Sequence, residues 1–312
     1  MGIKRFVVGG FETNTYLITK NDRAVLVDPG LDFISILDEV NKYQILAILI
    51  THGHVDHIDG CGYVNAPIYV GKEDLVNFSD NSRSLYKMSG MKPSYSNKNL
   101  NSNVKYFSSI QEINGCYLKD NYIYYYGDKV MSRDDIFIAG MHNVENCMGA
   151  IMLVKEFGVS NDIIVDVISN FRGVEHRLEY VDSIEGRRFY NDTEATNIKC
   201  TQIALSSFDK PTIIILGGLE RGQDFNELTP FIKNVKAIIG IGQCRERVLE
   251  YGKSVGIDTY IYEHLRDGFD KCYEVSDEGD IILLSPASAS FDMFKDVYDR
   301  GDQFKNLVAS LN

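Results

Sequence analysis

The sequence predicts an α/β protein whose second part is a doubly wound, Rossmann-like domain. From residue 186 onward, short apolar runs bounded by turn residues alternate with amphipathic helical patterns. Strands that alternate with helices in this way form parallel sheets covered on both faces. The runs expected to be strands are residues 212–216, 237–241, 259–262 and 280–284.

The N-terminal part alternates strands and helices over shorter distances. Asp32 is expected to cap a helix that places Phe33, Ile36, Leu37 and Val40 on one face. The strands expected here are residues 6–8, 15–19, 24–27, 45–50 and 66–70. The run 45–50 is too apolar for a half-exposed strand, so we expect it to be covered on both faces.

Between these parts, residues 75–104 are rich in Ser, Asn and Lys, which predicts a linker or surface excursion and a domain boundary near residue 100. A small antiparallel meander is expected at 115–131. Two helices should follow, one at 143–156 that ends at Gly158 and one that begins at Ser160. The inward-facing residues of the second are predicted to be Ile164, Val167, Ile168 and Phe171.

Composition limits the possible functions. The net charge of −12 gives no electrostatic support for nucleic-acid binding. No apolar stretch is long enough to span a membrane and the N-terminus lacks the pattern of a secretory signal, so we expect a cytoplasmic protein. The six cysteines form no C-x-x-C pair, which favours reduced, mostly buried thiols.

A metal-binding motif follows the apolar run 45–50. His52 and His54 are two residues apart on an extended segment and therefore project toward one ion, while Asp56 and His57 can serve a second. Imidazole and carboxylate are ligands that suit zinc or iron. Two such ions can activate a bridging water for hydrolysis. The alternative is a surface histidine cluster without metal.

Two segments of the N-terminal part resemble a known family. Residues 26–30 (Leu-Val-Asp-Pro-Gly) and 51–60 (Thr-His-Gly-His-Val-Asp-His-Ile-Asp-Gly) are similar to the glyoxalase-II-like hydrolases of the metallo-β-lactamase superfamily, over about residues 1–100. The resemblance implies a partial αββα-type fragment. It also implies a further histidine, a bridging aspartate and a final histidine, for which His142, His176 and His264 do not lie in the corresponding motifs. The expected ligand set is therefore incomplete.

A second resemblance covers about residues 104–312. It rests on residues 140–146, 175–179, 191–197, 217–222 and 284–292, which occur in this order. Together these motifs resemble the Mur ligases, in particular those that add D-glutamate to UDP-N-acetylmuramoyl-L-alanine in peptidoglycan precursor synthesis. The resemblance implies ATP and Mg²⁺ as cofactors and these small molecules as substrates.

The Mur resemblance assigns nucleotide contacts to four residues. Asn143 and Asn146 lie at i and i+3 of a helix start, so both amides face one side, where they would contact adenine. Arg177 would contact phosphate and Asp192 ribose. The alternatives are two capping asparagines and two solvated surface charges.

The same resemblance assigns D-glutamate binding to Thr196, Arg221, Ser290 and Phe291. The segment 285–291 follows a buried strand and opens a helix, where hydroxyls and backbone N–H groups can hold a carboxylate. Ordinary helix capping is the alternative. Glu194 stands where relatives commonly carry lysine, and Ser288 replaces a common cysteine.

Two parts of the Mur family have no counterpart in the sequence: the UDP-binding first domain and the glycine-rich phosphate loop that ends in Gly-Lys-Thr or Gly-Lys-Ser. The expected organisation is a metallo-β-lactamase-like fragment at 1–100, a remnant of the Mur central domain at 104–174 and the Mur C-terminal domain at 175–312. The favoured function is the D-glutamate-adding ligase, inactive as this chain. The alternatives are a binuclear metallohydrolase and a non-catalytic fusion or misassembled product.

Overall fold

The computed structural model describes residues 2–71 and 104–311, and the chain forms two compact units. Unit 1 combines residues 1–136 with 142–170, and unit 2 combines residues 137–141 with 171–312. These units differ from the ranges 1–100, 104–174 and 175–312, which were drawn from the family resemblances and remain predictions. The expected linker at 75–104 lies almost wholly outside the described residues.

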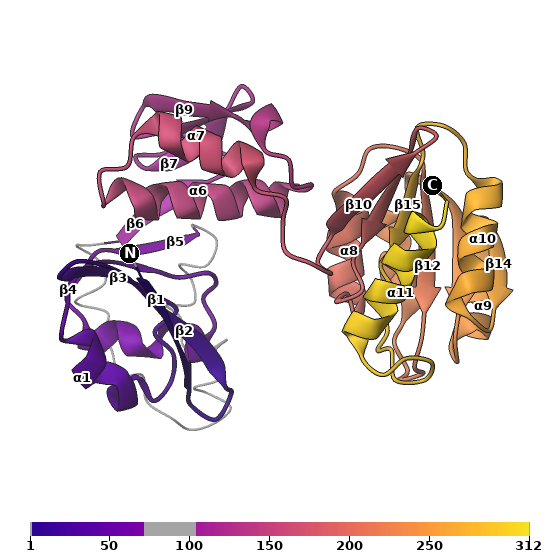
Figure 1. Ribbon diagram of the computed structural model, residues 1–312, viewed down its shortest axis with the longest axis horizontal. Coiled ribbons are helices and arrows are strands. Elements are labelled where there is room, and N and C mark those ends of the chain that lie inside the picture. Colours follow the sequence, from indigo (N-terminus) through magenta and orange to yellow (C-terminus); the bar gives the residue numbers. More distant parts are fainter. Residues whose placement is uncertain (1, 72–103, 312) are drawn as a thin grey trace. The chain divides into compact units, whose positions relative to one another are not determined.

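Unit 1 is built on one nine-stranded sheet whose strands follow the order of the sequence (Figure 1). The strands are β1 (Gly2–Val8), β2 (Thr13–Lys20), β3 (Arg23–Val27), β4 (Gln44–Leu49), β5 (Ile68–Gly71), β6 (Val104–Ser108), β7 (Cys116–Lys119), β8 (Tyr122–Tyr125) and β9 (Asp128–Ser132). Neighbouring strands from β3 to β7 are parallel, and the pairs at both ends of the sheet are antiparallel. The N-terminal strands and the predicted meander thus share one sheet.

Strand β4 is covered on both faces, as its apolar sequence predicts. Ala47 and Ile48 point to opposite faces and both are fully buried. Ile48 belongs to a core with Phe33 and Ile58, which lie in the short helical segments of this unit. Those segments are η1 (Phe33–Ile36), α1 (Leu37–Val40), α2 (Val55–Ile58), η2 (Asp59–Tyr63) and η5 (Arg133–Asp135).

The other face of the sheet is covered by α6 (Met141–Lys155) and α7 (Asn161–Asn170). Met148 and Ile151 of α6 are fully buried in one cluster with Val25 of β3 and Tyr69 of β5. Just beyond α6, the Glu156 carboxylate accepts hydrogen bonds from the Tyr69 hydroxyl and from Lys105 Nζ, the latter at 2.9 Å. A helix from the Mur-like segment therefore completes the core of the N-terminal strands.

Three local expectations for unit 1 are wrong. Asp32 adopts a positive φ of 60° and its side chain makes no capping hydrogen bond, so the predicted cap is wrong and the first turn is 3₁₀, although the stretch continues as α1 and its predicted face does pack in the core. Val167 is 61% exposed, because α7 packs through Ile164 and its neighbours along a stripe that excludes it. Phe171 lies beyond the end of α7 and is also exposed.

Unit 2 contains a six-stranded sheet in the order β10-β11-β15-β12-β13-β14. Its strands are β10 (Glu179–Ile184), β11 (Arg187–Asn191), β12 (Thr212–Gly217), β13 (Val235–Ile241), β14 (Asp258–Tyr262) and β15 (Ile281–Leu284). β10 and β11 are antiparallel, and the remaining pairs are parallel. The four predicted strands are confirmed; β10 and β11 were missed because their charged residues hide the apolar alternation.

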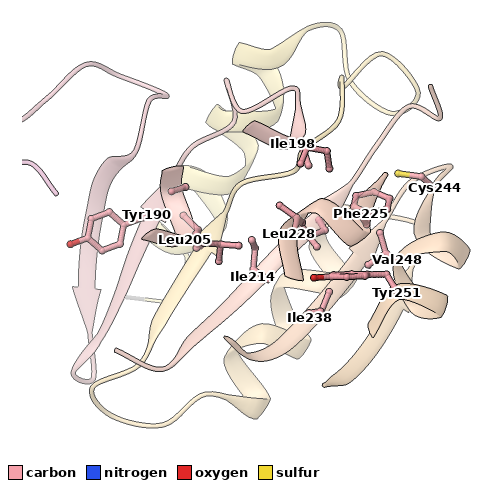
Figure 2. Packing of buried hydrophobic residues seen from close by; sticks show 14 of the residues in the cluster. Tyr190, Ile198, Leu205, Ile214, Phe225, Leu228, Ile238, Cys244, Val248 and Tyr251 are labelled. Atoms are coloured by element: carbon pink, nitrogen blue, oxygen red, sulfur yellow. The ribbon is translucent and has the colours of Figure 1, made fainter. Parts of the chain in front are cut away.

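Helical segments cover both faces of this sheet, which confirms the doubly wound fold. One face carries α8 (Ile198–Ser206), η6 (Phe225–Phe231) and α9 (Arg245–Val255), whose side chains pack on the sheet in Figure 2. The other face carries α10 (Leu265–Val275) and α11 (Val297–Ala309). Among the described residues, no helix combines the length and apolar character that a bilayer span needs.

The topology of unit 2 places its functional loops at one edge. The parallel strands all end at the same side of the sheet, and β15 inserts between β11 and β12, where the strand order reverses. In open α/β sheets, ligands bind outside the carboxyl ends of the strands at such a reversal. The loops after β11, β12, β13 and β15 therefore form the expected ligand-binding edge.

Candidate functional site

The histidine motif lies where the sequence predicts, directly after β4. His52 Nε2 and His54 Nδ1 are 3.1 Å apart, and His57 Nε2 is 3.4 Å from Asp56 Oδ2. The ring centroids of His52 and His57 are separated by 4.1 Å. Each predicted ion is thus offered two donor atoms that already face each other.

Asp28, which the sequence did not mark as part of the metal motif, organises it. Its carboxylate accepts hydrogen bonds from Thr51 N at 2.8 Å and Thr51 Oγ1 at 2.6 Å, and lies 3.0 Å from His57 Nδ1. A carboxylate on the second ring nitrogen orients a metal-binding histidine and leaves the other nitrogen for the ion. One sequence signal could have identified Asp28. It directly follows β3, the strand that pairs with β4, and the histidine motif follows β4.

The electrostatics distinguish two of the histidines. Burial, followed by the neighbouring imidazoles of His57 and His54, lowers the pKa of His52 and keeps it neutral as a ligand must be. Burial also acts to lower the pKa of His57, but the hydrogen bond to Asp28 and its charge prevail and raise it. The donor types fit zinc or iron, and the four predicted residues supply two ligands per ion, half of a tetrahedral shell.

The two predicted adenine contacts lie in the first turns of α6, in unit 1. Asn146 Nδ2 donates to Asn143 Oδ1 at 3.3 Å, so the amides share one side of the helix as their spacing predicts. Glu145, between them, accepts a hydrogen bond from Ser109 Oγ at 2.5 Å. This contact anchors the start of α6 beside the loop that follows β6.

The predicted phosphate and ribose contacts lie in unit 2. The Arg177 side chain is 72% exposed and its Nε lies 3.2 Å from Glu194 Oε2. Asp192 is buried after β11, where it accepts hydrogen bonds from Leu178 N at 3.0 Å and Ser285 Oγ at 2.7 Å. Burial raises the pKa of Asp192 to about 6, despite these two hydrogen bonds. Asp192 therefore ties the loops after β11 and β15 together within the fold.

The four predicted D-glutamate contacts all lie on loops at the carboxyl edge of the unit 2 sheet. Thr196 and Arg221 are exposed, Phe291 is 62% exposed, and Ser290 is fully buried. The loops carrying Arg221 and Ser290 are joined by the backbone hydrogen bond from Leu219 N to Ala289 O, at 2.9 Å. The structure thus gathers these loops at one edge, and the roles of the residues remain predictions.

The sequence does not predict that Arg300 is buried, because a charged residue in an amphipathic helix is usually exposed to solvent. Its side chain is fully buried and donates to Thr193 Oγ1, Thr193 O and Ser288 O at 2.8 to 3.0 Å. Burial lowers its pKa to about 10. From α11, Arg300 therefore fixes the loops after β11 and β15 against each other.

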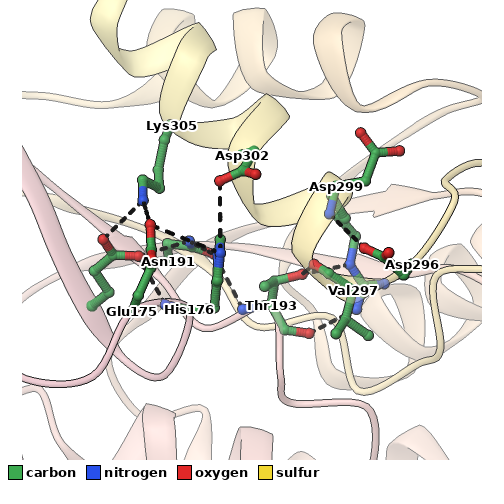
Figure 3. Close-up of polar contacts among 11 residues, drawn as sticks. Glu175, His176, Asn191, Thr193, Asp296, Val297, Asp299, Asp302 and Lys305 are labelled. Atoms are coloured by element: carbon green, nitrogen blue, oxygen red, sulfur yellow. Dashed lines mark hydrogen bonds and ion pairs between the residues drawn. The ribbon is translucent and has the colours of Figure 1, made fainter.

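A second group with metal-ligand chemistry is formed by Glu175, His176 and Asp302 (Figure 3). Its partners point to an ion-pair network. Lys305 Nζ contacts Glu175, and His176 Nδ1 lies 3.0 Å from Asn191 Nδ2, an amide nitrogen that can only donate. The neutral ring then carries its proton on Nε2, which faces Asp302 at 3.6 Å and is not available to an ion.

The only remnant of phosphate-loop sequence is Gly252-Lys253-Ser254. It shares the last three residues of that loop, but Arg247 stands where the first glycine would be, and the segment lies inside α9. Backbone N–H groups within a helix are engaged with its carbonyl groups and cannot cradle phosphate. This tripeptide therefore does not replace the missing loop.

Comparison with known proteins finds similarity to two classes of protein. Residues 8–125 match the metallo-beta-lactamase superfamily model. Over 207 residues, 66% of the chain, it is 45% identical to UDP-N-acetylmuramoylalanine–D-glutamate ligases of Bacillus cereus and Bacillus anthracis. Both resemblances are thus confirmed. The aligned part spans 46% of each relative, so the chain corresponds to less than half of those ligases.

Solved structures are similar at the level of fold. A UDP-N-acetylmuramoyl-L-alanyl-D-glutamate–2,6-diaminopimelate ligase matches with a TM-score of 0.58 and 14% identity, over 89% of this chain and 63% of that one. UDP-N-acetylmuramate-alanine ligase MurC from Thermotoga maritima matches with a TM-score of 0.51 and 14% identity, over 87% and 61%. Both alignments cover more of the chain than residues 104–312, so the likeness of fold extends into the N-terminal part.

Proposed function

We propose that residues 104–312 carry D-glutamate and nucleotide contacts of a ligase that adds D-glutamate to UDP-N-acetylmuramoyl-L-alanine, and that this chain alone does not turn over. The observation that carries the proposal is the 45% identity over 207 residues to ligases of that name. The placement of Thr196, Arg221 and Ser290 on loops at one sheet edge supports it.

The chemistry divides between the substrates and this chain. When bound, ATP and Mg²⁺ would supply the phosphoryl group that activates the substrate carboxylate as an acyl phosphate, from which the amine of D-glutamate would displace inorganic phosphate to form the amide. Asn143 and Asn146 are assigned to adenine, and Arg177 and Asp192 to phosphate and ribose. The loops after β11, β12 and β15 would hold and orient D-glutamate. This orientation of the amine is what residues 104–312 would contribute to the rate of amide formation.

The lack of turnover follows from the missing phosphate loop. Phosphoryl transfer depends almost entirely on positioning and on neutralising charge around the phosphates. No glycine-rich loop with the required spacing is present in the sequence, and Gly252-Lys253-Ser254 lies within a helix. Binding of D-glutamate can therefore persist where catalysis does not.

The test combines turnover with binding. The purified chain is given ATP, Mg²⁺, UDP-N-acetylmuramoyl-L-alanine and D-glutamate, and release of ADP is followed; we expect none. A titration monitored by NMR should detect weak D-glutamate binding that Arg221→Ala reduces. D-Glutamate-dependent ADP release that disappears in Arg221→Ala would contradict the proposal, since another segment would then supply the phosphate site.

A second candidate is a binuclear metallohydrolase of the glyoxalase II type, favoured by the contact of His57 with Asp28 at 3.0 Å and by the family match at residues 8–125. His52, His54, Asp56 and His57 supply half of the ligands that two tetrahedral ions require. We therefore expect negligible hydrolysis of a glutathione thioester. Hydrolysis that a chelator abolishes and zinc restores would favour this candidate over the ligase.

A further inference from the structure

The histidine motif and the start of α6 lie at the same edge of the unit 1 sheet. Strands β3 to β7 are all parallel, so the loops that follow them leave the sheet on one side. The motif follows β4, and Ser109 follows β6. Ser109 Oγ donates to Glu145 Oε1, in the first turns of α6, at 2.5 Å. α6 therefore begins at the edge that carries the motif.

α6 runs antiparallel to the strands that it covers. Glu145 near its start contacts the residue after β6, whereas Glu156 just beyond its end contacts Lys105, the second residue of β6. The strand β4 thus reaches the edge with its carboxyl end and the helix α6 with its amino end. The first N–H groups of a helix have no partner within it, so this end of α6 favours a negatively charged group.

A close contact keeps the two groups near each other. A Cβ atom on Gly149 would lie 3.7 Å from Leu49 Cδ1, so α6 packs on the last residue of β4. Asn146 and Asn143 precede Gly149 by about 4.5 and 9 Å along the helix axis. His52 follows Leu49 by at most about 11 Å. The amides and the imidazoles therefore extend from one point of contact toward the same side.

Both groups are open to solvent. His54 and Asn146 are exposed, and Asn143 and the other motif histidines are partly exposed. Asp56 and Glu145 make this edge acidic. A phosphate group alone is therefore repelled, whereas an ion on the histidines reverses the local charge. The motif supplies half of the ligands that two tetrahedral ions require, so phosphate oxygens can supply others.

We propose that the histidine motif and the start of α6 form one nucleotide site within unit 1. The base lies at Asn143 and Asn146, and the phosphates add ligands to an ion that the motif holds. The inference rests on the proposed function for the adenine contacts, and it adds a group that receives the phosphates in a chain without the phosphate loop. Metal and nucleotide should each strengthen the binding of the other, because the coupling between two ligands is reciprocal.

Cobalt tests the inference, because the visible absorption of Co²⁺ changes with its ligands. The full chain is titrated with Co²⁺ and then with ADP, pyrophosphate or adenosine, and each compound with Co²⁺ alone provides the blank. We expect ADP and pyrophosphate to change the cobalt spectrum of the chain, and adenosine to leave it unchanged. In calorimetry, Co²⁺ should lower the Kd for ADP about tenfold or more, the range for charge-assisted contacts.

Two variants address the two ends of the site. His54→Ala should abolish the effect of Co²⁺ on ADP binding, whereas His264→Ala, at an exposed position before α10 in unit 2, should preserve it. Asn146→Ala should raise the Kd for ADP about twofold to tenfold, the range for a lost hydrogen bond, and leave the Kd for pyrophosphate the same. Circular dichroism checks that each variant is folded.

The outcomes separate the inference from the proposed function. If Co²⁺ does not strengthen ADP binding, or if His54→Ala retains the effect, the phosphates do not bind at the motif and the inference is overturned. If pyrophosphate binds as tightly as ADP, the amides do not hold the base, and the single site is overturned as well. D-Glutamate binding in unit 2, which Arg221→Ala should reduce, needs neither cobalt nor His54, so the proposed function is judged independently.

Discussion

Arg300 and Thr193 are joined by two hydrogen bonds, from Nε to the Thr193 hydroxyl at 2.9 Å and from Nη2 to the Thr193 carbonyl at 2.8 Å. A third bond reaches the carbonyl oxygen of Ser288 at 3.0 Å. All three acceptors are uncharged, so the buried guanidinium acts here as a rigid hydrogen-bonding fork. It fixes the geometry of the loops after β11 and β15 on which the proposed substrate contacts depend.

Replacement of Arg300 by methionine should destabilise unit 2 by about 2–4 kcal/mol, because the carbonyl groups of Thr193 and Ser288 are left buried without donors. Arg300→Lys should recover only part of this, since one ammonium cannot reproduce the fork. Urea unfolding of the three proteins gives the comparison. A methionine variant as stable as the parent would show that water replaces the guanidinium.

The stability of the N-terminal strands should depend on helix α6. Ile151→Ala removes a fully buried side chain that packs in one cluster with Val25 and Tyr69, and should cost about 2–5 kcal/mol. Amide hydrogen exchange should then accelerate in β3 and β4 as well as in α6. Ile203→Ala, at a half-exposed position of α8 in unit 2, is the control. Faster exchange confined to α6 would mean that residues 2–71 fold independently.

Asp192 should make unit 2 less stable as the pH rises. Its pKa is about 6 in the fold against an ordinary value of 3.8, so between roughly pH 4 and 6 the folded state holds a proton that the unfolded state has released. Stability contributed by this group is therefore lost across that window, by at most about 3 kcal/mol. Relative to the parent, Asp192→Asn should gain stability from pH 4 to pH 7.5 in urea unfolding. An unchanged difference would contradict this.

Metal should bind weakly. Because His52, His54, Asp56 and His57 supply two ligands per ion, we expect substoichiometric zinc or iron after purification without added metal. Elemental analysis measures this directly. Asp28→Asn should reduce what is bound by about 10-fold or more through the orientation of His57. Two firmly held ions per chain would contradict the expectation and promote the hydrolase candidate.

Much of the fold could be predicted because most strands and helices have strong periodic patterns. Residues 45–50 and the strands β12, β13 and β15 are largely continuous apolar runs. β12 and β15 are buried throughout, β13 is buried from Ala237 to Ile241, and β4 is buried at Ala47 and Ile48. Strands β10 and β11 were missed because Glu179, Arg187 and Arg188 interrupt their alternation. The exposure of Val167 depends on how α7 meets the sheet, which no local pattern encodes.

The candidate sites were predicted unevenly for a similar reason. Motif residues such as His52 and Ser290 are recognisable from local sequence, and the structure places them on loops at strand ends. Asp28 and Arg300 act through partners that are distant in sequence. Their contribution is visible only once the fold brings Thr51 and Thr193 next to them.

The shared core of unit 1 also determines when its first strands can be buried during translation. β3 is complete at residue 27, but the buried cluster that contains Val25 is complete only when Ile164 of α7 has been made, 137 residues later. At about 5–20 residues per second, the apolar face of the first strands waits roughly 7–27 s on the ribosome. A nascent chain of this protein should therefore depend on chaperones that shield strands during translation, and truncations before residue 164 should aggregate.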